Sequence, residues 1–231
     1  MNESTSAPRV FANRTAAGAQ LARALKQRTL KPPVTVLGLP RGGVAVAAPV
    51  AKALHAALDV IVVRKVGFPG QPELAIGAIA APDIVVREPL VQDELSEYED
   101  LPDAAFERAA SEARRELERR QQLYRADLPP LDLSGKTAIL VDDGLATGST
   151  MLAAIRAARA AKAARIIVAA PIASPDAAAL VAAEADETVF LETPRLFAIS
   201  QWYGEFEQLD DHEVCRLLAL ARGSPAPKTF R

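Results

Sequence analysis

Short apolar runs alternate with longer stretches of helical periodicity along most of this chain. Runs rich in Val, Ile and Leu predict strands at 34–39, 59–63, 139–141, 166–170 and 187–191. Their lack of polar alternation is typical of strands buried on both faces. Apolar residues at helical spacing predict intervening helices at 14–28, 44–58, 151–164 and 175–184, and a last helix that ends near residue 222. The alternation predicts an α/β fold with a mostly parallel sheet flanked by helices.

The middle of the chain departs from this pattern. Two further strands are predicted at 74–80 and 84–86, and an acidic stretch at 93–103 precedes a charged helix at 104–125. The apolar positions of that helix keep helical spacing, and we interpret its charges as either a solvated face or an interface. The terminal segments 1–9 and 223–231 are polar and are predicted to be tails of a single domain that spans 10–222.

Composition narrows the class of protein. Half of the 231 residues are apolar and the formal net charge is −2, which excludes extensive disorder and gives no electrostatic case for a nucleic-acid partner. Cys215 is the single cysteine, so neither a disulfide framework nor a cysteine metal cluster is expected. No apolar run approaches the length of a membrane span, and the polar start does not resemble a secretory signal. We therefore expect a cytoplasmic protein without a membrane partner.

The strongest chemical signal follows the strand at 139–141. Asp142 and Asp143 come directly after the apolar run, and a loop of Gly and hydroxyl residues then opens a helix. Helix N-termini bind phosphate through unpaired N–H groups, whereas adjacent carboxylates suit the hydroxyls of a sugar or a Mg²⁺ ion. A ligand with a sugar diol beside a phosphate satisfies both halves. No Lys follows Gly148, which excludes a Walker A loop, and no G-x-G-x-x-G is present.

This block resembles the phosphoribosyl-pyrophosphate (PRPP) signature of type I phosphoribosyltransferases. The resemblance implies that Asp142 and Asp143 hold the ribose 2′- and 3′-hydroxyls and contact Mg²⁺ indirectly or through PRPP. It also implies a PRPP-binding loop that holds the 5′-phosphate, made of Gly144, Ala146, Thr147, Gly148, Ser149 and Thr150. From about residue 10 to residue 215 the chain is similar to a subgroup of predicted bacterial phosphoribosyltransferases whose acceptor is uncertain. The matching residues include Phe11-x-Asn13-Arg14 and Trp202-Tyr203-x-x-Phe206.

Two other loops follow predicted strands and carry basic residues. In the first, Arg41 precedes Gly42 and Gly43, a pattern that lets backbone N–H groups and a guanidinium approach an anion. It resembles the family's pyrophosphate loop, which implies that these three residues bind the diphosphate. The second loop, predicted at 64–73, resembles the flexible catalytic loop of the family. That resemblance implies catalytic roles for Arg64 and Lys65 on the leaving diphosphate and for Glu73 as acid or base.

The resemblance implies a transfer of the 5-phosphoribosyl group from PRPP to an acceptor, a nitrogenous base, in nucleotide salvage. Ala146 occupies the position at which 6-oxopurine enzymes carry an Asp, so adenine is the first candidate acceptor. Family members also carry a small hood, expected here from 10–30 and 192–212, beside a core at 34–191. Three aromatic residues of the tail are candidates to stack on the base or simply to pack the tail, namely Phe197, Trp202 and Tyr203.

Two other functions stay open at this point. A PRPP-binding regulator would keep the fold without transferring the sugar. The basic residues of the two loops argue against it, because a regulator needs them less than an enzyme does. A PRPP hydrolase would use water as the acceptor. The resemblance also implies a homodimer, since type I enzymes are commonly dimeric.

Overall fold

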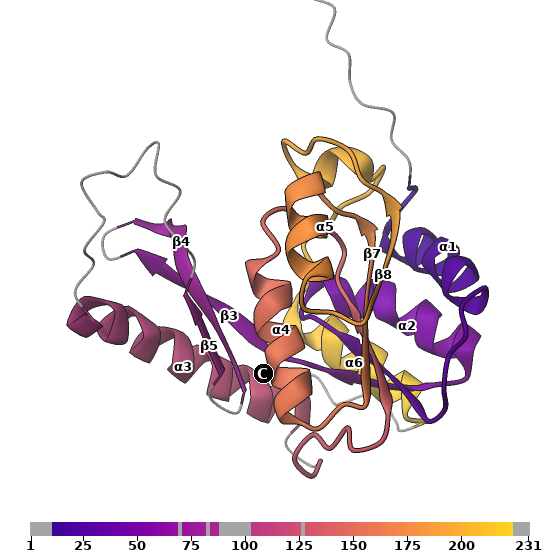
Figure 1. Cartoon of the computed structure of the whole chain (residues 1–231), viewed down its shortest axis with the longest axis horizontal. Coiled ribbons are helices and arrows are strands. Elements are labelled where there is room, and N and C mark those ends of the chain that lie inside the picture. Colours follow the sequence, from indigo (N-terminus) through magenta and orange to yellow (C-terminus); the bar gives the residue numbers. More distant parts are fainter. Residues whose placement is uncertain (1–10, 69–70, 82–83, 88–102, 126–127, 224–231) are drawn as a thin grey trace, which may run out of the picture.

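A five-stranded parallel sheet forms the centre of the computed structural model, which describes residues 11–68, 71–81, 84–87, 103–125 and 128–223 (Figure 1). Its strand order is β2-β1-β6-β7-β8, and each neighbouring pair is parallel. The strands are β1 (Val34–Gly38), β2 (Ala57–Val60), β6 (Thr137–Val141), β7 (Arg165–Ile172) and β8 (Glu187–Glu192). The predicted fold class is thereby confirmed.

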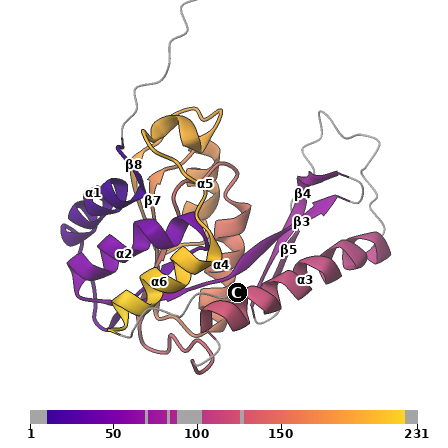
Figure 2. The same ribbon diagram turned by 180° about the vertical axis from the view of Figure 1, so that it is seen from behind.

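Helices cover both faces of this sheet, because its strands are apolar on both sides. Leu140 of β6 packs in the cluster with α4 (Ser149–Ala160) and α5 (Pro175–Ala182). Its neighbours Ile139 and Val141 pack in the opposite cluster, whose helices are α1 (Arg14–Lys26), α2 (Gly42–Leu54) and α6 (Asp211–Ala221). Figure 2 shows α1, α2 and α6 together on the second face. Among the described helices, none combines the length and apolar composition needed to cross a bilayer.

A second, antiparallel sheet stands beside the first and corrects two predictions. It contains β3 (Val63–Phe68), β4 (Gln71–Ala80) and β5 (Ile84–Arg87), in the order β3-β4-β5. The predicted strand at 59–63 is therefore split, since β2 ends at Val60 and the chain leaves the parallel sheet. The predicted loop at 64–73 was wrong as well. Its Gly and Pro residues mark a hairpin whose ladder is only shifted in register around Gly67.

The charged helix α3 (Asp103–Arg125) lies along this second sheet, as Figure 1 shows. Its apolar residues Phe106 and Ala110 pack in one cluster with Val66 and Ile79 of the sheet. Its C-terminal end is tied to the main body, because the Tyr124 hydroxyl donates to Asp211 of α6 and the Arg125 Nε donates to Asp59 of β2. The helix therefore joins the antiparallel sheet to the core.

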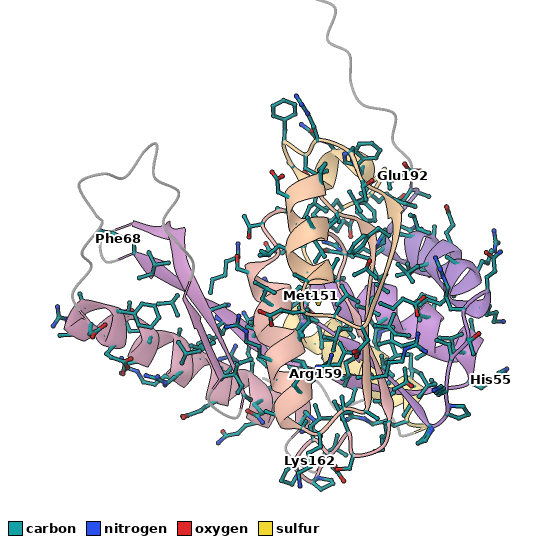
Figure 3. All side chains as sticks on the ribbon, viewed as in Figure 1. His55, Phe68, Met151, Arg159, Lys162 and Glu192 are labelled. Carbon is teal, nitrogen blue, oxygen red and sulfur yellow. The ribbon has the colours of Figure 1, made fainter. Side chains whose placement is uncertain are left out.

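The strand order reverses between β1 and β6. From β1 the chain continues to β2 on one side, whereas from β6 it proceeds through β7 to β8 on the other. In open α/β sheets, ligands bind at the carboxyl ends of the strands at such a switch point. Figure 3 indicates this edge, with Glu192 at the carboxyl end of β8 and Lys162, in the turn after α4, at the opposite end.

The beginning of the described chain meets the segment after η1 (Ile199–Trp202) near the same edge. Phe11 forms a parallel bridge with Tyr203, its N–H donates to the Trp202 carbonyl at 3.1 Å, and its carbonyl accepts from Gly204 N–H at 2.7 Å. Helix α1, which the sequence assigned to a hood, lies with α2 in the layer over the sheet. The division into core and hood stays a prediction.

Candidate active site

Two helices begin without a side-chain cap at the switch point. Helix α2 starts after β1 and α4 starts after β6, and neither N-cap residue, Arg41 or Gly148, makes a capping hydrogen bond through a side chain. By contrast, side chains cap α1, α5 and α6, namely Asn13, Ser174 and Asp210. The first N–H groups of an uncapped helix carry partial positive charge and need an acceptor. Adjacent strands therefore present two places for anions.

The acid pair lies between these two helix starts, at the end of β6. The Asp142 Oδ1 accepts the backbone N–H of Asp143 at 2.8 Å, and the Asp143 Oδ2 accepts the Nε of Arg14 at 2.7 Å. Burial and then the neighbouring charge of Asp143 raise the pKa of Asp142 well above its usual value. Burial also raises the pKa of Asp143, against the opposing charge of Arg14. The negative charge of the acid pair is thus only partly balanced by Arg14, and its oxygens are suited to accept hydrogen bonds from a ligand.

Glycines allow the loop after β1 to approach this acid pair. A Cβ atom on Gly42 would overlap the Asp143 carboxylate, and one on Gly43 would meet the Val141 carbonyl and the Cα of Asp142. A side chain at either position would push the two loops apart. Gly42 and Gly43, predicted to contact the diphosphate, therefore also have a packing role that the sequence did not reveal.

The loop from Gly144 to Gly148 is held from both sides. The Leu145 N–H donates to the Ile172 carbonyl at 2.9 Å, and the Ser174 hydroxyl donates to the Ala146 carbonyl at 2.7 Å. Gly148 adopts φ = 85°, a left-handed conformation that favours glycine, and so directs the chain into α4. The loop is therefore anchored before any ligand arrives.

Hydroxyl groups accompany the start of α4. The Thr147 Oγ1 lies 2.8 Å from the Ser149 Oγ, and Ser149 is buried whereas Ala146 and Thr147 are exposed. Thr150 is partly buried in the first turn. The predicted phosphate loop thus gathers hydroxyls at a helix start that no side chain caps.

The predicted catalytic residues lie on the antiparallel sheet rather than in a loop. Arg64 is on β3, and its Nε is buried without a hydrogen-bond partner among the described residues. Burial, followed by the charges of Arg120 and Arg41, lowers the pKa of Arg64, whereas Glu116 opposes the shift. Arg64 is therefore within electrostatic reach of the loop after β1. Lys65 is exposed, and Glu73 lies on β4 with its side chain outside the described atoms.

The three aromatic candidates of the tail have different environments. Tyr203 is 2% exposed, lies between the rings of Phe11 and Phe206, and donates its hydroxyl to the Asp143 carbonyl at 2.6 Å. Its position matches the alternative in which the ring packs the tail. Trp202, in the short helix η1 (Ile199–Trp202), is partly exposed, and Phe197 is 94% exposed. These two rings keep a free face for a planar ligand.

Arg14 is the residue at this site to which the sequence assigned no role. It was named only as part of Phe11-x-Asn13-Arg14. The one signal for its role was that Asp142 and Asp143 have no basic residue beside them in the sequence, which indicates a cationic partner from elsewhere in the chain. Its partner Asp143 is 129 positions away, so periodicity and local motifs do not reveal the contact.

The acidic residues of the site can be compared with what a Mg²⁺ ion needs as ligands. In the part of the chain that the structure describes, no three His, Cys, Asp or Glu side chains gather into a metal site. Arg14 already pairs with Asp143, which leaves Asp142 as the carboxylate of the pair without a paired cation among the described side chains. Mg²⁺ commonly binds one or two carboxylates together with substrate oxygens and waters. The residues therefore fit an ion held mainly by a phosphate ligand.

Known proteins resemble this chain over most of its length. The sequence profile of the phosphoribosyl transferase domain matches residues 11–197. A Mycobacterium tuberculosis protein named "Putative phosphoribosyl transferase Rv0571c" is 45% identical over 211 residues, which are 91% of this chain and 46% of that protein. The chain thus spans about half the length of the curated relatives it matches. The crystal structure of TT1426 from Thermus thermophilus is 40% identical with a TM-score of 0.73, covering 90% of this chain and 97% of that one. The chain belongs to the phosphoribosyl transferase domain family.

Proposed function

We propose that this chain transfers the 5-phosphoribosyl group of PRPP to a nitrogenous base and releases diphosphate. One observation carries the proposal: a partly buried acid pair lies between two uncapped helix starts at the switch point of the sheet. PRPP has the complementary order of groups, with a phosphate at one end, a diol in the middle and a diphosphate at the other end. Few simple ligands carry two anionic groups separated by a pair of hydroxyls, and such a ligand needs two anion sites with carboxylates between them.

In the proposed complex, each part of the site takes one part of PRPP. The start of α4 and the hydroxyls of Thr147 and Ser149 hold the 5′-phosphate. Asp142 and Asp143 accept hydrogen bonds from the ribose hydroxyls. The start of α2 and the Arg41 guanidinium hold the diphosphate, since the N–H groups and the cation favour the same anion.

In the proposed reaction, a nitrogen of the base forms a bond to C1 of the ribose while the bond from C1 to the diphosphate oxygen breaks. The diphosphate leaves with the electron pair, and the base loses a proton, for which Glu73 is the candidate acceptor. Arg41, Arg64 and Lys65 stabilise the charge that grows on the leaving group. The buried Nε of Arg64 supports its part, because it has no hydrogen-bond partner among the described residues and can donate to an anion. When bound, Mg²⁺ would neutralise diphosphate charge beside Asp142 and Asp143.

The acceptor proposed first is adenine, in nucleotide salvage. Ala146 is exposed at the position where the 6-oxopurine enzymes carry an Asp, so the carboxylate that would act on a 6-oxopurine is missing. Trp202 and Phe197, with their accessible rings, are proposed to stack on the base, and Tyr203 to support them from below. A homodimer and a cytoplasmic location are part of the same proposal.

The test is to incubate the chain with PRPP, Mg²⁺ and a panel of purine and pyrimidine bases, and to follow diphosphate release. Release that depends on one base supports the proposal, and the Asp142→Asn, Asp143→Asn double variant should lose it. Asp132→Asn is the matched control, because Asp132 is exposed on a distant turn. Release without any base would indicate a hydrolase. PRPP binding without release would indicate a regulator, and no PRPP binding would overturn the proposal.

A further inference from the structure

Arg14 contacts two separate segments of the chain at the edge of the acid pair, through three different groups. Its Nε donates to the Asp143 Oδ2 at 2.7 Å, and its Nη1 donates to the Glu207 carbonyl at 2.7 Å. Its guanidinium lies 3.8 Å from the centre of the Phe206 ring. The two side chains of the ion pair are only 12% and 14% exposed. The guanidinium is thus fixed by a carboxylate, a carbonyl and a ring at once.

The geometry of a guanidinium suits this position. Its planar fork directs Nε toward the acid pair and Nη1 toward the tail, and its flat face stacks on Phe206. A lysine has the same charge, but its single ammonium lacks the planar fork that reaches two acceptors in different directions while stacking on the ring. The arrangement therefore requires more than a positive charge.

Each carboxylate of the acid pair has one oxygen that accepts a hydrogen bond from another group. The Asp143 Oδ2 is occupied by Arg14, and the Asp142 Oδ1 is occupied by the backbone N–H of Asp143. Apart from the contact between the two carboxyl groups themselves, the remaining oxygen of each accepts no hydrogen bond from another residue within the described ranges. One free oxygen on each of two adjacent carboxylates matches two adjacent hydroxyl donors, which is the pattern of a ribose diol.

We infer that Arg14 is a positioning residue for the ribose. It holds one oxygen of Asp143, so that the other oxygen points to the ligand, and it compensates the charge of the acid pair beside a phosphate-bearing ligand. The inference rests on the proposed function, since it takes the ribose of PRPP as the diol. Arg14 acts through Asp143 and is not assigned a contact with the reacting atoms.

Ligands that use different parts of the site separate this role from a general structural one. Ribose 5-phosphate carries the diol and the 5′-phosphate, whereas inorganic diphosphate uses the loop after β1. We expect Arg14→Gln to weaken the binding of PRPP and of ribose 5-phosphate about 10- to 100-fold, the effect of losing a hydrogen bond to a charged group. Its affinity for diphosphate should fall less than its affinity for ribose 5-phosphate, because diphosphate loses a nearby positive charge but no oriented carboxylate. Arg14→Lys should recover part of the loss.

The measurement is isothermal titration calorimetry on the full chain, with thermal unfolding of each variant as a check of folding. Arg156→Gln is the matched control, because Arg156 pairs with Glu184 on the surface away from the acids. In a double-mutant cycle, adding Arg14→Gln to Asp143→Asn should change ribose 5-phosphate affinity less than about twofold, since Arg14 acts through that carboxylate.

Three results would overturn the inference. Equal loss of diphosphate and ribose 5-phosphate affinity in Arg14→Gln would indicate a structural role instead. Unchanged affinity for PRPP and ribose 5-phosphate would leave the proposed function intact and remove the role of Arg14. A wild-type chain that binds neither PRPP nor ribose 5-phosphate would remove the proposed function, and the inference with it.

Discussion

Replacing Asp142 with Asn should make the fold more stable while it removes the proposed ribose site. Asp142 has its carboxylate partly buried beside that of Asp143, and Arg14 pairs with the second acid rather than with the first. An amide has the same shape and carries no charge. Its oxygen can still accept the Asp143 N–H that is now 2.8 Å from Oδ1. The substitution therefore removes the repulsion without removing the hydrogen bond.

The expected change in the free energy of unfolding comes from the repulsion that the variant removes, because the hydrogen bond to the Asp143 N–H is kept. Relief of a strained functional site commonly adds about 1 kcal/mol to the free energy of unfolding. For a chain of this size, that gain corresponds to a rise in Tm of about 2–4 °C. The gain should depend on pH. The pKa of Asp142 is raised in the folded state, so the unfolded chain loses this proton first as the pH rises above about 3.9. Wild-type stability then falls until the raised pKa is passed, and the variant lacks this fall.

The assay is thermal unfolding of wild type and Asp142→Asn between about pH 3.5 and pH 8, a window that begins below the ordinary pKa of an Asp, in buffers without PRPP or Mg²⁺. The two Tm curves should converge at the acidic end and separate toward neutral pH, with the variant higher. Asp132→Asn serves as the control, because the pKa of the exposed Asp132 is lowered by hydrogen bonds from Ser134 and its removal should give no gain. A variant that is less stable than wild type at neutral pH would refute the reasoning that the acid pair is undercompensated.

Other predictions test the neighbouring features. Gly42→Ala should weaken PRPP binding at least about tenfold and cost about 1–3 kcal/mol of stability, because its methyl group would overlap the Asp143 carboxylate; calorimetry and thermal unfolding measure both. Hydrogen bonds from Arg119 lower the pKa of Glu116 to about 2, so its contribution to stability should be lost as the pH falls from about 4.5 toward 2. Glu116→Gln should flatten the acid side of the Tm curve, and an unchanged acid side would contradict the ion-pair network. Ile155→Ala in the core should cost about 2–5 kcal/mol in chemical denaturation, whereas Leu220→Ala, at a side chain that is 58% exposed, should change stability by less than about 0.5 kcal/mol.

The parallel sheet could be predicted because burial on both faces leaves a plain record in the sequence. Strands such as 137–141 are buried at each position, so they read as continuous apolar runs rather than alternating ones. The acid pair and the Gly-rich loop could be recognised as a candidate site because their residues are consecutive in the sequence. The same reasoning was wrong at 64–73, where Gly and Pro were taken for a loop. Pairing between β3 and β4, a tertiary interaction, makes residues 64–68 and 71–73 parts of strands.

The contacts that join distant segments were not predictable. Arg14 lies 129 positions from Asp143 and 193 positions from Glu207, and nothing local to α1 indicates either partner. The role of Gly42 in binding diphosphate stays a prediction, and its packing role was not predicted. Its place in an anion loop follows from Arg41-Gly42-Gly43, whereas its close approach to Asp143 depends on the neighbouring placement of β1 and β6. Such features follow from topology, which periodicity does not encode.

The bridge between Phe11 and Tyr203 sets the order in which the site is completed during synthesis. Phe11, Arg14 and the acids leave the ribosome long before Tyr203 and Glu207, which are needed to close the network around Asp143. Contacts of such large sequence separation form late in folding. A growing chain therefore has the starts of α2 and α4 before the hydrogen-bond network around Asp143 is complete, and we expect the proposed binding of PRPP only after residue 207 has been added.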